Sequence, residues 1–385
     1  MKRNLCYRIT IALILAFALQ ALMPTISLAL EEEIDEYTDG QYCTVYDEDD
    51  PSQEIFVTSR LVSVGDEYQT ADDRLFEVVR VEGNKAYARF VRQVGLDDLR
   101  TDFRAILASI LESAPAKKRN VTVGIYHTHS DESYTPTDGT SSIRGNGGIY
   151  KVGQVLAKSL ERAGVKVIHS QARHDPHDVA AYKRSRRTAQ ELLGKSTALL
   201  DVHRDAVPRE HYTTEINGRK VAQVQLVVGR QNPNMAANKQ FAQEVKAAAD
   251  RQQPGLVKGI FFARSGYNQD LSPRNLLLEV GTDKHTRDEA ERGASLFAKS
   301  YANYLAASAV GSRAGHQRES QVGSNTAIWL VGLVIVGAAI YMLLSTGSWN
   351  ELSSKLRTFA TREFANAFGS ASRQRRDKDK DRDKK

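Results

Sequence analysis

Apolar runs and amphipathic segments alternate along residues 119–308. Short apolar runs predict buried strands, and apolar residues three or four positions apart predict helices. A mainly parallel sheet covered by helices accounts for this alternation, so we expect an α/β fold. The expected strands are 121–125, 165–169, 197–203, 223–229 and 276–280, and the expected helices are 149–163, 180–193, 236–251 and 287–306.

A small β region with a helix at its end is expected before this domain, over residues 30–118. After an acidic, loop-like stretch at 31–50, apolar and polar residues alternate over 55–64, 75–81 and 85–91, as they do in half-buried strands. The helix is expected at 96–113. Because the region contains no histidine, we expect it to support the domain or to dock a partner, without supplying an imidazole ligand.

Residues 1–29 have the pattern of a secretory signal peptide. They contain no acidic residue, begin with basic residues, continue through an apolar run at 9–23 and end on Ser27-Leu28-Ala29. The apolar run is short for a bilayer span, which needs about 20 residues. We therefore expect export followed by cleavage, with an uncleaved anchor as the alternative.

A second apolar segment, residues 327–344, contains no charged residue and is long enough to span a membrane. It follows a linker at 309–325, so we assign a transmembrane helix to 326–345 and a basic tail to 346–385. By the positive-inside rule the tail is cytoplasmic. This predicts a single-pass protein of the cell membrane whose domain at 119–308 is extracytoplasmic.

The two ends of the chain account for its positive charge. Of the formal net charge of +6, residues 1–29 hold +3 and residues 351–385 hold +5, which leaves −2 for the remainder. A nearly neutral exported part lacks the basic footprint of nucleic-acid binding, so no nucleic-acid partner is expected. The tail is expected either to contact anionic lipid headgroups or to serve only as a stop-transfer flank. Since Cys43 is the one cysteine beyond the signal, an intrachain disulfide and a cysteine-rich zinc site are excluded there.

Histidines and acidic residues stand at the ends of three expected strands. His127, His129 and Glu132 follow the first, His203 ends another, and Glu279 ends the last. Because such strands bring their carboxyl ends to one edge of the sheet, these residues are expected to converge. Neutral imidazoles and a carboxylate are ligands of Zn²⁺, and three protein ligands with one open position are the catalytic arrangement. Each residue alone would be explained as a core histidine or a loop carboxylate, but together they predict a zinc site.

The three phrases that carry these residues resemble the stage II sporulation protein P family. They are His-Thr-His-x-x-Glu-Ser-Tyr at 127–134, Leu-Asp-Val-His-Arg-Asp-Ala at 200–206 and Leu-Leu-Glu-Val-Gly-Thr at 277–282, and the resemblance covers about residues 119–308. It implies an amidase-like fold related to zinc-dependent N-acetylmuramoyl-L-alanine amidases. The implied substrate is peptidoglycan, cut at the amide bond between muramic acid and the stem peptide, with an endopeptidase activity on cross-links.

The resemblance also implies a part in engulfment during sporulation, with a lytic transglycosylase and a membrane scaffold protein as partners. The expected C-terminal span departs from the N-terminal anchor that is usual in that family. A peptidoglycan-binding or scaffold module without catalysis is one competing function, although no expected ligand is lost. Another exported metallohydrolase, such as a polysaccharide deacetylase, is a second, although its histidines and aspartates are differently spaced.

The amidase resemblance assigns roles to these residues. His129 is the first zinc ligand with His127 as the alternative, and His203 and Glu132 complete the set. Glu279 is the general base that moves a proton from water to the leaving nitrogen. Arg204 is expected to stabilise the developing oxyanion, to bind a substrate carboxylate, or to pair with a neighbouring aspartate, Asp201 or Asp205. Two further histidines, His174 and His177, lie in a polar loop on which nothing else is expected to converge.

Overall fold

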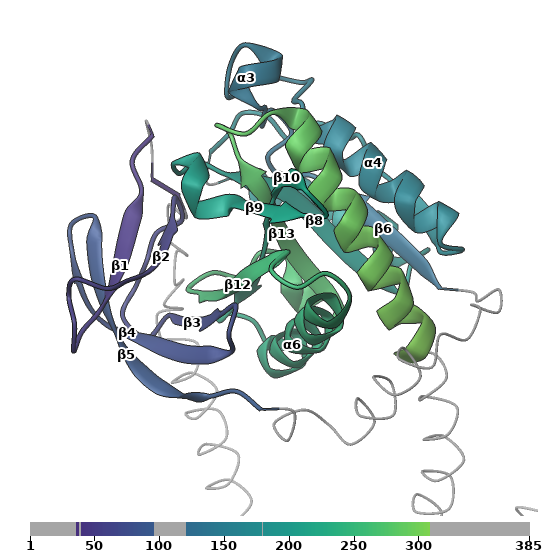
Figure 1. The fold of residues 1–385 in the computed structure, drawn as a ribbon. Helices are drawn as coiled ribbons and strands as arrows, with labels where there is room; N and C mark the ends of the chain where they lie inside the picture. The colour runs from purple at the N-terminus through teal and green to yellow at the C-terminus, as the bar shows by residue number, and fades with distance from the viewer. Residues whose placement is uncertain (1–35, 38–39, 96–120, 179, 309–385) are drawn as a thin grey trace, which may run out of the picture. The chain divides into compact units, whose positions relative to one another are not determined.

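The computed structural model describes residues 36–37, 40–95, 121–178 and 180–308 (Figure 1). The expected signal peptide, the helix at 96–113, the linker, the transmembrane segment and the tail lie outside these ranges. Within them, no helix combines the length and the apolar character needed to cross a bilayer.

One sheet of 11 strands contains both the N-terminal β region and the domain that follows it. Its order is β2-β1-β5-β4-β3-β12-β11-β13-β8-β6-β7, and the two regions join where β3 pairs with β12. The N-terminal strands are β1 Cys43–Asp47, β2 Glu54–Thr58, β3 Glu67–Thr70, β4 Arg74–Glu82 and β5 Lys85–Gln93. The domain contributes β6 Thr122–Tyr126, β7 Lys166–His169, β8 Ala198–Asp205, β11 Val224–Gly229, β12 Val257–Ala263 and β13 Asn275–Thr282, while β9 Thr213–Ile216 and β10 Arg219–Ala222 form a separate hairpin.

Helices cover both faces of the domain's strands, as predicted. The helices α4 Ile149–Arg162, α6 Met235–Gln252 and the one over 287–308 lie along the domain's strands (Figure 1). Their buried side chains share one apolar core with these strands. α5 Ala181–Leu193 packs on the other face, against Tyr126 and Leu199. The short helices are α3 Thr135–Asp138, η2 Arg209–Tyr212 and η3 Gln269–Leu271.

The central strands are apolar on both faces because each face is covered. Along β11, Leu226 and Val228 lie in the core shared with the helices, whereas Val227 lies in a second core with Phe56 of β2 and Phe261 of β12. This is the alternation of side chains expected along a strand. The N-terminal strands therefore bury a face of the domain's own sheet.

The prediction of a mainly parallel sheet holds in part: among the domain's described strands of this sheet one pair, β13 with β11, is antiparallel, but the 11-stranded sheet as a whole is mixed. β7, β6, β8 and β13 are mutually parallel where they pair, but β13 is antiparallel to β11, and the pairs from β12 through β3 and β4 to β5 are antiparallel. The strand β12 and the β9–β10 hairpin were not predicted. A strand has the same apolar pattern in either direction, so the pattern alone could not reveal the reversal between β13 and β11.

The three strands that carry the sequence phrases lie side by side. β6, β8 and β13 are parallel neighbours, with Tyr126 opposite Asp201 and His203 opposite Glu279. The expectation that the three phrases meet at one edge of the sheet is confirmed.

Candidate metal centre

The polar segment that follows β6, residues 127–134, is almost completely buried. A second loop satisfies its backbone, because the carbonyl groups of residues 130, 131 and 132 accept hydrogen bonds from the N–H groups of residues 147, 143 and 149, respectively. Gly147 permits this approach, since a Cβ there would lie 2.5 Å from the carbonyl oxygen of Glu132. The second loop thereby fixes the position of Glu132.

Four side chains converge beside this segment: Glu36, His129, Glu132 and His203 each place one possible ligand atom within 4.8 Å of the others. His129 Nδ1 lies 3.3 Å from Glu132 Oε1 and 3.5 Å from Glu36 Oε1. His203 Nδ1 lies 3.4 Å from Glu132 Oε1. Corners of a tetrahedron with metal bonds of about 2.0–2.2 Å are roughly 3.3–3.6 Å apart. The spacing and the nitrogen and oxygen donors therefore fit a zinc ion.

The charges of the cluster also favour a cation. Burial opposes ionisation of Glu132, yet the positive charges of His203 and Arg204 hold its pKa well below the usual range. Burial likewise opposes a charge on His203, but Asp201 and Glu132 raise its pKa well above the usual value. A metal ion at the cluster would take the place of a proton on Nδ1 of His203, because a ligating imidazole nitrogen must be deprotonated.

Asp201 orients His203 from the side away from the cluster. Its Oδ1 lies 3.0 Å from His203 Nε2 and accepts a hydrogen bond from the N–H of Thr128 at 2.8 Å. A carboxylate on the far nitrogen of a ligating histidine fixes the ring and its tautomer. His203 is thus held with Nδ1 toward Glu132.

His127 lies outside the cluster. Its Nδ1–H donates to the carbonyl of Val202 at 2.8 Å, and its Nε2 is 2.9 Å from Nε2 of His169. Burial, together with the neighbouring His169, lowers the pKa of His127 to about 3, and burial lowers that of His169 to about 4. Both nitrogens of His127 are therefore engaged, and the structure brings His129 but not His127 to the other candidate ligands.

The N-terminal β region supplies two charged side chains that the sequence analysis missed. The backbones of Glu36 and Arg60 form an isolated bridge, and Arg60 Nη2 lies 3.2 Å from Glu36 Oε1. Burial favours a neutral Glu36, but His129 and Arg60 lower its pKa far below the usual range. The region was expected to support the domain or to dock a partner without supplying an imidazole; in addition, its Glu36 brings a carboxylate to the cluster. The acidic composition of residues 31–50 was the only available signal.

His177 also converges on the site, contrary to expectation. Its ring stacks on His129 with centroids 3.8 Å apart, and its nitrogens lie 3.2 Å from Asp131 Oδ1 and 3.3 Å from Glu36 Oε2. Burial opposes a charge on His177, but hydrogen bonds to Asp131 and Glu36 raise its pKa to about 10. His174 is instead a buried structural residue, whose Nδ1–H donates to the carbonyl of His127 at 2.7 Å.

Glu279 lies opposite His203 on the neighbouring strand β13 and is buried. Arg60 Nε donates to its Oε1 at 2.8 Å, and Arg60 Nη2 lies 2.6 Å from the same oxygen. Burial raises the pKa of Glu279 to about 7, against the opposing effects of Arg60 and His203. A carboxylate whose pKa lies near neutrality is suited to accept and return a proton.

Arg204 contacts Glu132, and the carboxylates of Asp201 and Asp205 have other partners. Its N–H donates to Glu132 Oε2 at 3.0 Å, its Nη1 lies 4.0 Å from Glu132 Oε1, and its Nη2 donates to the carbonyl of Ser141 at 3.0 Å. Asp201 contacts His203, and Asp205 accepts a hydrogen bond from the hydroxyl of Tyr212 at 2.8 Å.

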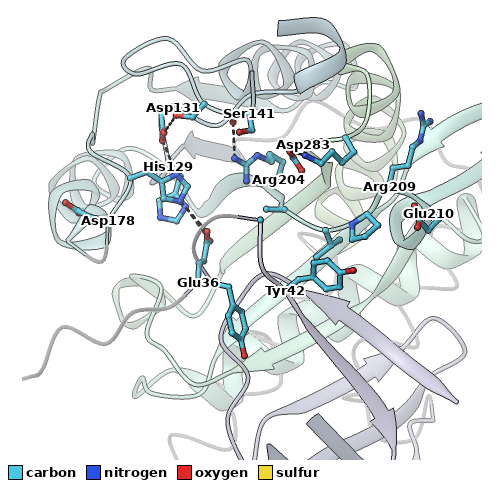
Figure 2. Close-up of a pocket in the computed structure, with 18 residues that line it drawn as sticks. Glu36, Tyr42, His129, Asp131, Ser141, Asp178, Arg204, Arg209, Glu210 and Asp283 are labelled. Carbon is cyan, nitrogen blue, oxygen red and sulfur yellow. Dashed lines mark hydrogen bonds and ion pairs between the residues drawn. The ribbon is translucent and has the colours of Figure 1, made fainter. Parts of the chain in front are cut away.

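A cavity of about 990 Å³ opens over the cluster (Figure 2). Glu36 and His129 lie toward one side of it and Arg209 toward the other, with Arg204 between them (Figure 2). Glu279 does not line this cavity. The cavity is large enough for a ligand of several residues or sugar rings, and two of the candidate metal ligands, Glu36 and His129, form part of its wall.

The fold and the site thus define an α/β protein with a buried cluster of histidines and carboxylates that could hold a metal ion. A sequence model of the family described as Stage II sporulation protein P matches residues 32–302, so the chain belongs to the stage II sporulation protein P family. The chain is 32% identical over 193 residues to the Stage II sporulation protein P of Bacillus subtilis (strain 168), which is 45% of this chain and 48% of that protein. It therefore spans about half the length of this curated relative.

Solved structures of amidases show a weak likeness. The N-acetylmuramyl-L-alanine amidase Ami1 of Mycobacterium smegmatis is 15% identical, with a TM-score of 0.34 over 50% of this chain and 98% of that one. An N-acetylmuramoyl-L-alanine amidase of Clostridium difficile 630 is 14% identical, with a TM-score of 0.29 over 48% of this chain and 94% of that one. These scores are too low to bear on the fold or the chemistry.

Proposed function

We propose that this protein is a zinc-dependent peptidoglycan hydrolase that cleaves the amide bond between N-acetylmuramic acid and the L-alanine of the stem peptide. The observation that carries the proposal is the cluster of two imidazoles and two carboxylates, of which His129 and Glu36 line a large cavity. Membership of the stage II sporulation protein P family supports a role in sporulation, at engulfment. Cleavage of peptide cross-links is a second activity that the same site could support.

His129, Glu132 and His203 are the residues that would hold the ion. When bound, zinc would lower the pKa of a water molecule toward 7 and polarise the amide carbonyl. Asp201 keeps the His203 ring in place, and the contact with Arg204 keeps Glu132 ionised. Glu36 lies at the remaining corner of the cluster, so the substrate has to displace it.

Glu279 acts as the general base and acid in this proposal. It takes the proton of the attacking water and returns it to the amide nitrogen, because an amine leaves readily only when it is protonated. Its pKa, raised by burial to about 7, suits both directions of transfer. Arg204 lines the cavity beside the cluster and stabilises the negative charge that develops on the carbonyl oxygen.

The proposed setting is the outer face of the cell membrane, with the protein anchored by residues 326–345. The polymer substrate would then lie on the same side as the cavity. A lytic transglycosylase and a membrane scaffold protein are the proposed partners, on the basis of the family resemblance alone.

One observation favours a second function, a peptidoglycan-binding module without catalysis. Structural zinc sites have four protein ligands, whereas catalytic sites keep one position open. With Glu36 in the cluster, four protein side chains are close enough to ligate, as a structural site requires.

Digestion of purified sacculi separates these functions. The full-length protein in detergent is incubated with sacculi, with and without a zinc chelator, and the soluble products are identified by mass spectrometry. We expect stem peptides with a free L-alanine amino group, released only without the chelator. Glu132→Gln, which removes a candidate ligand, should lose both zinc and activity.

Other outcomes would refute the amidase proposal. Release of acetate without peptides would indicate a deacetylase. Sedimentation with sacculi in the absence of any product would indicate a binding module.

A further inference from the structure

Arg60 is a buried arginine that the N-terminal β region inserts beside the metal cluster. It follows β2, its side chain is 1% exposed, and its backbone N–H donates to Thr58 Oγ1 at 3.1 Å. The guanidinium lies over the ring of Tyr267, 5.1 Å from the ring centroid, and Nη1 donates to the hydroxyl of Tyr182 at 3.3 Å. These contacts hold the guanidinium in one orientation.

Two nitrogens of this guanidinium contact one oxygen of Glu279. Nε donates to Oε1 at 2.8 Å and Nη2 lies 2.6 Å from the same atom. The other oxygen, Oε2, is buried and accepts no hydrogen bond from a described residue. An arginine that serves only as an ion-pair partner commonly uses its planar fork on both oxygens of the carboxylate.

A second arginine–carboxylate pair in the same protein provides the contrast. Arg230 also directs Nε and Nη2 to one oxygen, Asp66 Oδ1, at 3.0 and 2.7 Å. There, however, Asp66 Oδ2 accepts the N–H of Ser63 at 2.7 Å, so both oxygens are satisfied. Glu279 differs in keeping one oxygen uncommitted, and it does so next to the strand that carries His203.

We propose that Arg60 is a positioning residue for the hydrolysis reaction: it holds Oε1 of Glu279 so that Oε2 stays oriented and free to carry the proton. This inference rests on the proposed function, in which Glu279 is the general base. It gives the N-terminal β region a part in catalysis that acts through Glu279. It also explains the choice of arginine, because lysine is a point charge on a flexible stem and cannot fix the rotation of a carboxylate with two nitrogens.

The test compares Arg60→Met and Arg60→Lys with the control Arg230→Met in the full-length protein. Turnover of a soluble muropeptide, kcat and KM, zinc content and melting temperature are measured for each variant. We expect both Arg60 variants to lower kcat about 100-fold, because a misaligned reacting group costs a rate factor of this order. KM should stay within about threefold of the wild type and zinc content should be unchanged.

The control and the lysine variant separate a role of Arg60 in turnover from a role in stability. Arg230→Met breaks a similar ion pair away from the cluster and should lower the melting temperature while kcat remains within about twofold of the wild type. If Arg60→Met unfolds the protein, Arg60→Lys, which retains the charge, decides the question. Wild-type kcat in Arg60→Lys, or a loss of activity that follows loss of zinc, would overturn the role of Arg60 while leaving the hydrolase proposal intact. An inactive wild-type protein would overturn both.

Discussion

Replacement of His129 by alanine should abolish high-affinity zinc binding, whereas the same replacement at His127 should not. The two histidines are two residues apart in one buried segment, yet only His129 lies within the cluster. His127 instead donates to the carbonyl of Val202 and contacts His169. The pair of variants therefore separates loss of a ligand from loss of a structural residue.

The expected magnitude follows from sharing the binding energy among the ligands. Structural zinc sites bind with about 10–16 kcal/mol, so one ligand of four contributes roughly 3 kcal/mol, or about a 100-fold change in affinity. In a zinc buffer at about 100 times the wild-type dissociation constant, zinc should stabilise the wild type by about 2.7 kcal/mol. The same buffer should stabilise His129→Ala by only about 0.4 kcal/mol.

His127→Ala should show the opposite behaviour. It leaves the buried carbonyl of Val202 without its hydrogen bond and creates a cavity, which together should lower the free energy of unfolding by about 3 kcal/mol with or without zinc. The increment caused by zinc should remain near that of the wild type. Urea unfolding at two zinc activities measures both quantities, and the reasoning is refuted if His127→Ala loses the zinc increment while His129→Ala keeps it.

Three further outcomes are expected. Glu279→Gln should keep zinc but lower kcat by about 100-fold or more, since the amide cannot serve as a base; full activity measured on muropeptides would remove Glu279 from the mechanism. Glu36→Gln should lower zinc affinity less than Glu132→Gln does and leave kcat at or above the wild-type value, and a complete loss of turnover would instead make Glu36 an obligatory ligand. Burial lowers the pKa of His285 to about 4 in the folded protein, whereas in the unfolded chain this histidine takes up a proton near pH 6.5. As the pH falls from 6.5 to 4, the free energy of unfolding of the wild type should therefore decrease by about 3 kcal/mol relative to that of His285→Gln. Urea midpoints at both pH values, with His211→Gln as the surface control, test this difference, which should be absent above pH 7.

The part of the fold that local patterns determine could be predicted from the sequence. The sequence predicted α4 and α6 from their amphipathic spacing and β6, β8 and β13 from their apolar runs. These patterns are local, because each helix buries one face along its whole length and each of these strands is buried throughout. The convergence of His129, His203 and Glu279 then followed from the geometry of neighbouring parallel strands. The direction of β11 could not be predicted in this way, because it depends on how the chain returns to the sheet.

The residues that sequence reasoning missed reach the site across long separations in the chain. Glu36 and Arg60 precede the domain by a complete β region, and they arrive at the cluster because β3 pairs with β12 and closes the two regions into one sheet. His177 arrives in a loop whose position depends on stacking against His129. The hydrophobic periodicity of a segment does not reveal such contacts, because they depend on partners far away in the chain rather than on a local preference.

The charges around the cluster explain why these missed residues belong to the site. Glu132 and Glu279 are buried and Glu36 is partly buried, and buried carboxylates remain ionised only when positive groups compensate them. His203 and Arg204 compensate Glu132, and His129 and Arg60 compensate Glu36. Glu279 pairs with Arg60 of the N-terminal region. A domain cut at residue 119 would retain Glu279 without its arginine and His129 without Glu36. The β region and the domain therefore contribute to one site. Removal of the β region should alter proton transfer by Glu279 even if the domain stays folded.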